Sequence, residues 1–185
     1  MYQILIDGCL DYLEIGILEN RKIIYSKMTK LNKNFTYIFN NEIESILKSL
    51  NIKNNDIESI YLINGPGSFT STKLISLFAN TFKFVYNHLK IYELNSLEWM
   101  ITKDMEIACI DAKSGLFFLG VKNKFPVLVR QSDVKKIYDD YSFYIYTFDS
   151  KKDINIKWEK NKNNFIEVKY SRPLYIKPAV YDSSK

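Results

Sequence analysis

The 185-residue sequence predicts a two-lobed α/β protein, and three features of the chain support this prediction. A short apolar run from Ile57 to Ile63 has the length of a strand, and it stops at a Gly-Pro-Gly turn before a helical pattern begins. The segment from Phe35 to Leu50 places its apolar residues on one stripe at helical spacing. Finally, an Asp that ends an apolar run, with a Gly nine residues later, occurs twice at an offset of 104 residues.

Three strands are expected before the first helix, at Met1–Asp7, Tyr12–Leu18 and Lys22–Lys27. The first is almost continuously apolar, which is typical of a strand buried on both faces. The second alternates large apolar residues with positions such as Glu14 and Gly16. That alternation predicts an antiparallel strand with only one buried face.

The helix from Phe35 to Leu50 comes next, and a polar loop leads from it into the strand that ends at Ile63. Three further elements are predicted, a helix at Ser71–Tyr86, a strand at Lys90–Glu93 and a helix at Ser96–Ile101. Residues 1–103 then have the order β-β-β-α-β-α-β-α. This is the order of the ribonuclease-H-like lobe of the duplicated actin-like (ASKHA) fold.

Residues 104–185 are expected to form a second lobe that is a shortened and degenerate copy of the first. The pair Ile110-Asp111 repeats Ile6-Asp7, and the pair Gly120-Val121 repeats Gly16-Ile17. The predicted strands of this copy are Glu106–Asp111, Leu116–Lys122, Val127–Val129 and Phe143–Thr147.

Two further segments of residues 104–185 have separate predictions. The segment Lys151–Lys162 is polar and rich in lysine, so we expect a solvated loop. The tail Pro173–Lys177 is expected to return to the first lobe as a strand or as the start of a helix.

Composition narrows the classes of protein to which the chain can belong. Hydrophobic residues make up 46% and aromatic residues 15%, which argues against a disordered chain. No apolar run is long enough for a membrane span and no signal-peptide pattern opens the chain, so we expect a cytoplasmic protein. Cys9 and Cys109 are expected to be buried free thiols, with a single disulfide as the alternative.

The net charge of +5 would suit contact with RNA phosphates. Lysine is abundant along the whole chain, however, and no arginine cluster or base-stacking motif focuses the charge. A direct contact with nucleic acid therefore stays open.

The turn after Ile63 is the strongest local signal. Gly65 and Gly67 bracket Pro66, so the chain must bend sharply there. Ser68, Thr70 or Ser71 can then cap the following helix. A strand, a glycine-rich turn and a helix N-terminus can together hold a phosphate, but the same residues also make a structural turn without a ligand.

The candidate catalytic residues are few. Asp7 and Asp111 end apolar strands, where carboxylates could orient Mg²⁺ or water, or could simply accept hydrogen bonds from the following turns. The hairpin after Asp7 adds another acid and carries no hydroxyl, so it repels phosphate, and we expect both carboxylates to be vestigial. His88 is the single histidine, which excludes a paired-histidine metal site, and we expect it at a helix C-terminus or on the surface.

The second helix carries apolar residues on two faces. A stripe at Ile75, Phe78, Phe82 and Val85 is expected to face the sheet. Leu77 and Phe84 lie off that stripe, beside Lys73 and Asn80. They are expected to contact a partner or to be covered by the second lobe.

Four stretches in the right order resemble the TsaB (YeaZ) family, the partners of the tRNA threonylcarbamoyladenosine synthase TsaD. The turn Gly65–Thr70 is similar to the signature of that family, and Tyr2–Asp7 to its opening strand. Ile110–Lys113 resembles its second Asp strand, and Ser171–Lys177 its Pro-x-Tyr-Leu-Arg tail. The chain departs from the pattern after the turn, where serines replace two helix glycines and Lys73 replaces an arginine.

The resemblance implies a non-catalytic scaffold that binds TsaD, helps to recruit the ATPase TsaE and meets tRNA through the complex. It implies no tightly bound cofactor, with ATP or ADP and Mg²⁺ acting only at the level of the complex, and no membrane contact. The first two helices would pack against TsaD, or against a second copy in a homodimer, through Phe39, Lys73, Leu74, Leu77, Asn80, Thr81 and Phe84. The alternative is a small ATP-dependent phosphotransferase of the ASKHA type.

Overall fold

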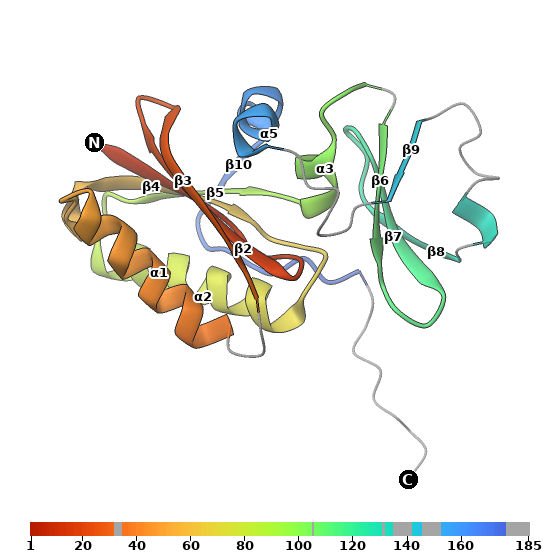
Figure 1. Ribbon diagram of the computed structural model, residues 1–185, viewed down its shortest axis with the longest axis horizontal. Helices are drawn as coiled ribbons and strands as arrows, with labels where there is room; N and C mark the ends of the chain where they lie inside the picture. Colours follow the sequence, from red (N-terminus) through yellow and green to blue (C-terminus); the bar gives the residue numbers. More distant parts are fainter. Residues whose placement is uncertain (32–34, 105, 131, 135–141, 146–152, 177–185) are drawn as a thin grey trace, which may run out of the picture.

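The computed structural model describes residues 1–31, 35–104, 106–130, 132–134, 142–145 and 153–176, and it contains two β-sheets (Figure 1). The first sheet has the strand order β10-β5-β4-β1-β2-β3. Its strands are β1 (Tyr2–Asp7), β2 (Tyr12–Glu19), β3 (Lys22–Lys30), β4 (Ile57–Ile63), β5 (Lys90–Leu94) and β10 (Ile166–Val168). β1 runs parallel to β4 and antiparallel to β2, and β4 runs parallel to β5.

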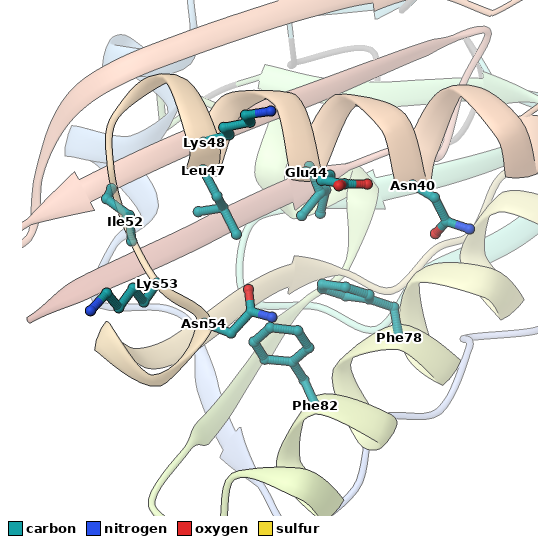
Figure 2. A pocket seen from close by; sticks show the side chains of 10 residues that line it. Asn40, Glu44, Leu47, Lys48, Ile52, Lys53, Asn54, Phe78 and Phe82 are labelled. Carbon is teal, nitrogen blue, oxygen red and sulfur yellow. The ribbon is translucent and has the colours of Figure 1, made fainter.

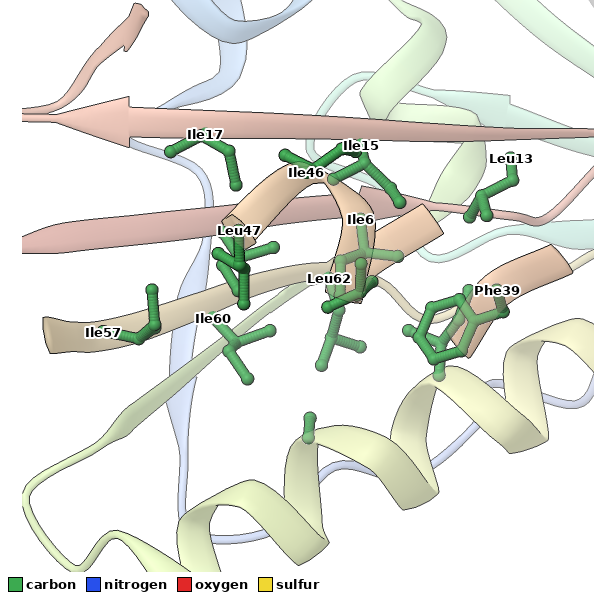
Figure 3. Packing of buried hydrophobic residues seen from close by; sticks show 14 of the residues in the cluster. Ile6, Leu13, Ile15, Ile17, Phe39, Ile46, Leu47, Ile57, Ile60 and Leu62 are labelled. Atoms are coloured by element: carbon green, nitrogen blue, oxygen red, sulfur yellow. The ribbon is translucent and has the colours of Figure 1, made fainter. Parts of the chain in front are cut away.

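Two helices cover one face of this sheet, α1 (Phe35–Ser49) and α2 (Phe69–Val85). The predicted stripe of α1 is confirmed, because Phe39, Ile43 and Ile46 are among its buried residues. They pack with Ile6, Leu62 and their neighbours on the central strands (Figure 3). This cluster is the largest apolar core of the described residues, and it fixes the two helices side by side.

The opposite face of the first sheet is covered by α5 (Ile154–Asn161), with Trp99 of the short helix α3 (Ser96–Met100) beside it. The rest of α3 packs against β6 (Glu106–Asp111) and β7 (Leu116–Val121). The prediction of a solvated loop over Lys151–Lys162 was therefore wrong where the structure describes that segment. Ile154 and Trp158 of α5 are 4% and 1% exposed, and they pack against Leu5, Tyr61 and Trp99. Only two of the four buried residues of this helix are apolar, which was too few to reveal a helix from the sequence.

The same helix corrects the prediction for β2. Residues Tyr12 to Leu18 are all buried, so the strand has two covered faces rather than one. Glu14 is covered by α5, where its carboxylate pairs with the ammonium of Lys157. Gly16 lies beneath Ile154, whose Cδ1 is 3.2 Å from the place where a Cβ on Gly16 would stand.

The second sheet has the order β8-β7-β6-β9, with β6 (Glu106–Asp111), β7 (Leu116–Val121), β8 (Val127–Arg130) and β9 (Ser142–Ile145). β6 pairs antiparallel with β7 and parallel with β9, and β7 pairs antiparallel with β8. This is the arrangement of β3-β2-β1-β4 in the first sheet, so the predicted duplication is confirmed. The last two residues of the predicted strand Phe143–Thr147 lie outside the described residues.

The chain returns to the first sheet earlier than expected. After α5, the strand β10 pairs antiparallel with β5 at the edge of the sheet. Residues 171–176, which we call the C-terminal strap, then follow α2 without forming a helix or a strand. Leu174 N donates to Asn64 O at 2.7 Å, so the predicted return of the tail is confirmed, but its expected secondary structure is not.

Candidate functional site

The Gly-Pro-Gly turn lies at the carboxyl end of β4, and its two glycines have different roles. Gly65 adopts a φ of +108°, in the region that favours glycine. Gly67 is constrained instead by its close approach to Cys9. A Cβ on Gly67 would stand 2.1 Å from the carbonyl oxygen of Cys9, a separation that no side chain tolerates.

Hydrogen bonds tie this turn to the elements around it. Ser68 is the N-cap of α2, and its Oγ accepts a hydrogen bond from Ser71 N at 3.4 Å. Ser68 N donates to Cys9 O at 2.7 Å, which joins the turn to the β1–β2 hairpin. Ser96 N donates to Gly65 O and Ser96 Oγ donates to Pro66 O, at 2.8 and 2.6 Å. Much of the polar backbone of the turn is thus used internally, and a phosphate contact at Gly65–Thr70 stays a prediction.

The two strand-end carboxylates accept hydrogen bonds from the turns that follow them. Asp7 is 1% exposed and accepts from Cys9 N at 3.1 Å and from the Tyr12 hydroxyl at 3.4 Å. Asp111 is exposed and accepts from Lys113 N at 2.7 Å. That amide, with help from the Lys113 ammonium, lowers the pKa of Asp111. Within the ranges that the structure describes, no group of three or more His, Cys, Asp or Glu residues could hold a metal ion.

Both cysteines are buried free thiols, as predicted. Burial raises the pKa of Cys9 well above its ordinary value, and it raises the pKa of Cys109 to about 12. These thiols are therefore protonated, and a thiolate nucleophile is disfavoured. His88 is exposed just beyond α2, with its Nε2 3.1 Å from Ile57 O.

The outer face of α2 exposes large apolar side chains. Leu77 is 59% exposed and Phe84 is 87% exposed, so no other part of the described chain covers them. Val85 was expected to face the sheet, but it is 61% exposed, and Ala79 takes a place against the sheet instead.

The other residues predicted for a partner surface differ in exposure. Lys73 and Thr81 are exposed, and Leu74 and Asn80 are half-buried. Phe39 is fully buried and packs edge-to-face on Phe78, with ring centroids 5.2 Å apart. It belongs to the core between the helices rather than to an outer surface, so its assignment to the partner face was wrong.

A groove of about 510 Å³ lies between α1 and α2 beside this face (Figure 2). Its floor is apolar and includes Leu47, Phe78 and Phe82, and its rim carries charged side chains such as Glu44 and Lys48. The groove was not predicted, because it depends on how the two helices pack against each other rather than on the sequence of either helix alone.

A second pocket, of about 530 Å³, lies at the carboxyl ends of β4 and β5, where α/β sheets commonly bind ligands. Its lining includes Asn64, Glu93, Glu98 and Lys124. Burial raises the pKa of Glu93 and of Glu98. At neutral pH two partly desolvated carboxylates make this pocket a poor place for a phosphate group.

The protein-family model described as "TsaD: tRNA N6-adenosine threonylcarbamoyltransferase" matches residues 24–170, which is most of the chain. The chain belongs to the TsaD family. Two family relatives are the uncharacterized protein MG208 of Mycoplasma genitalium and the MG208 homolog of Mycoplasma pneumoniae. Each is 25% identical over 122 residues, or 65% of this chain, and the match spans 62% of the relative's own length.

Two solved structures share the fold of this chain. One is an uncharacterized protein with similarity to peptidase YeaZ from Pseudomonas aeruginosa, with a TM-score of 0.75 at 9% identity over 95% of this chain and 99% of that one. Another is YeaZ from Pseudomonas aeruginosa, with a TM-score of 0.63 at 12% identity over 72% and 68% of the two chains. The actin-like fold and the resemblance to TsaB (YeaZ) are thus confirmed. None of the helices in the described part of this family member is long and apolar enough to cross a membrane.

Proposed function

We propose that this chain is a non-catalytic scaffold subunit of the complex that installs threonylcarbamoyl on a tRNA adenosine. In this proposal the outer face of α1 and α2 binds a TsaD-like catalytic subunit. Membership of the TsaD family gives the context. The observation that carries the proposal is the exposure of Leu77 and Phe84 on one face of a rigid helix.

Exposed apolar side chains of this size usually mark a partner surface, and a few such anchors supply most of the binding energy of an interface. Successive buried residues hold α2 against the sheet, so these anchors are preorganised. The neighbouring groove, with Phe78 and Phe82 in its floor, can receive side chains of a partner helix. The replaced helix glycines do not obstruct this face, because Ser71 and Ser76 are buried on the other side of α2.

Three observations support a non-catalytic role. The carboxylate of Asp7 is buried and engaged by its own turn, and both thiols have raised pKa values. The pocket at the ends of β4 and β5 presents Glu93 and Glu98, which would repel the phosphates of ATP. We therefore propose that ATP or ADP and Mg²⁺ act in the complex, with a TsaE-like ATPase, rather than on this chain alone. The same helix face would also serve a homodimer.

The deciding experiment is a pull-down of a purified TsaD-like subunit by the full chain and by two variants. Phe84→Asp should weaken the association by several kcal/mol, because it places an unpaired charge in the contact. Phe125→Asp is the matched control, since Phe125 is 72% exposed in the turn between β7 and β8, away from α2. Both variants should melt like the wild type. Equal capture by all three proteins would remove this helix face from the interface.

A separate assay addresses the phosphotransferase alternative. The isolated chain should neither hydrolyse ATP nor bind it tightly in the presence of Mg²⁺. Turnover of ATP that disappears in Asp7→Asn would overturn the non-catalytic role and would favour a small kinase.

A further inference from the structure

The C-terminal strap is fixed along α2 by hydrogen bonds. Ser171 N donates to Asn80 Oδ1 at 2.7 Å, and Asn80 Nδ2 donates back to Ser171 O at 3.0 Å. Further along, Arg172 N donates to Glu93 Oε1 at 3.0 Å. These bonds and the one from Leu174 hold the backbone of the strap in place along α2 and β5.

The strap ends in a stacked aromatic pair beside the Gly-Pro-Gly turn. The rings of Tyr175 and Phe69 are 5.0 Å apart between centroids and 24° from parallel. Stacking does not bury them, since Tyr175 is 50% exposed and Phe69 is 57% exposed. The ammonium of Lys73, one turn along α2, lies 5.9 Å from the centre of the Phe69 ring.

A second combination of an aromatic ring and a cation lies at the other end of the strap. Tyr170 is 57% exposed, and Lys169 Nζ is 5.5 Å from the centre of its ring. Arg172, which is exposed, stands between the two ends of the strap. We call these six residues the aromatic–basic surface: Phe69, Lys73, Lys169, Tyr170, Arg172 and Tyr175.

We propose that the aromatic–basic surface binds a single-stranded segment of RNA. Aromatic rings offer faces on which unpaired bases stack, and lysine and arginine attract the phosphates between them. Rigid exposed rings interleaved with cations are typical of such sites. The inference rests on the proposed function, because it supplies the RNA contact that a scaffold in a tRNA-modifying complex would use.

Charge complementarity favours RNA over a protein anchor at this surface. Three of its six residues are cations, in a chain of net charge +5. Glu93, the acid that meets the strap, is not one of the six residues, and its carboxylate accepts hydrogen bonds from Arg172 N and from Asn64 Nδ2 beside the neighbouring pocket. Phe84, the strongest anchor proposed for the protein partner, lies fifteen residues beyond Phe69, or about 22 Å along the helix. Lys73 lies one turn from Leu77 on α2, so the two surfaces adjoin there and are separate at Phe84 and Tyr175.

The test is fluorescence anisotropy of a labelled single-stranded oligouridylate with the full chain, compared with duplex RNA of the same length. The single strand should bind more tightly, because a duplex hides its base faces. Tyr175→Leu keeps an apolar side chain but removes the stacking ring, so the affinity should fall by about tenfold or more. Tyr175→Phe should retain the affinity, and Tyr37→Ala, which removes a 70% exposed tyrosine on α1, should do the same.

Lys73→Gln gives a second readout that does not depend on the ring. It should reduce the slope of log K against log salt by about 0.7, the contribution of one phosphate contact to a single strand. Melting curves of all variants check that the strap stays folded.

Equal binding by the wild type and Tyr175→Leu would overturn the RNA contact, and so would equal affinity for the duplex and the single strand. If Tyr175→Leu no longer captures the TsaD-like subunit in the pull-down but still binds RNA like the wild type, this surface belongs to the protein interface instead. The proposed function is judged separately, because it depends on the response of that pull-down to Phe84→Asp.

Discussion

The ion pair between Lys157 and Glu14 should control whether α5 stays packed on the first sheet. Lys157 Nζ lies 2.5 Å from Glu14 Oε2, and the two side chains are 0% and 3% exposed. The same ammonium is 5.1 Å from the centre of the Trp99 ring, which gives it a second favourable contact. Lys157→Met removes this cation from beside the buried Glu14 carboxylate.

The expected loss follows from the burial of the pair. Breaking a buried ion pair by removing one partner costs about 3–5 kcal/mol, because the remaining carboxylate loses its counter-ion at a desolvated site. For a chain of this length each kcal/mol lowers the melting temperature by about 2–4 °C, so Lys157→Met should melt about 6–20 °C lower. Replacing both residues, as Lys157→Met with Glu14→Leu, should restore most of the stability, since two apolar side chains of similar volume suit the site.

The assay is thermal unfolding followed by circular dichroism, with urea titration to obtain the free energy. Lys160→Met is the matched control, because Lys160 is exposed on the same helix and should change stability by no more than about 0.5 kcal/mol. A Lys157→Met protein that unfolds like the control would refute the reasoning. A double variant less stable than Lys157→Met would also refute it, since the pair would then not act as a unit.

Three further predictions concern the site and its surroundings. Gly67→Ala should lower the free energy of unfolding by about 1–3 kcal/mol, because its Cβ would overlap the Cys9 carbonyl, and an unchanged urea midpoint would contradict this. Cys9 and Cys109 should not react with a thiol reagent in the folded protein at neutral pH and should both react in denaturant, because burial raises their pKa values. The pKa of Glu98 is also raised by burial, so the folded state favours its protonated form, and stability from this group is lost as pH rises. Glu98→Gln should therefore melt above the wild type at neutral pH, and the difference should vanish below about pH 4.

The first lobe could be predicted from the sequence because its signals are local. The helical stripe of α1 and the apolar runs of β1 and β4 each reveal their own buried faces. The Gly-Pro-Gly turn was equally visible, since glycine and proline act on the backbone where they stand. The duplicated Asp and Gly positions then identified β6 and β7, even though the second sheet is short.

What the sequence did not reveal depends on contacts between distant parts of the chain. The burial of Glu14 follows from a lysine 143 positions later, and no periodicity within β2 records that. Phe69 and Tyr175 are far apart in the sequence and stack only in the folded chain, which is why the sequence showed no stacking motif. Phe39 was wrongly assigned to the partner surface for a related reason, because it is buried by its contact with Phe78 of the second helix, α2.

The strand-end carboxylate and the glycine-rich turn that the sequence offered for a phosphate make contacts within the fold. The carboxylate of Asp7 accepts hydrogen bonds from its own hairpin, and Ser68 N, at the start of α2, donates to the Cys9 carbonyl. The same hairpin is thereby fixed to α2, and the C-terminal strap is fixed to both α2 and β5. An α2 that is held in place and exposes large apolar side chains on one face suits a scaffold, because binding then costs little conformational entropy. The interior of the fold supplies that rigidity, and the proposed functions belong to the outer surface of α2 and the strap.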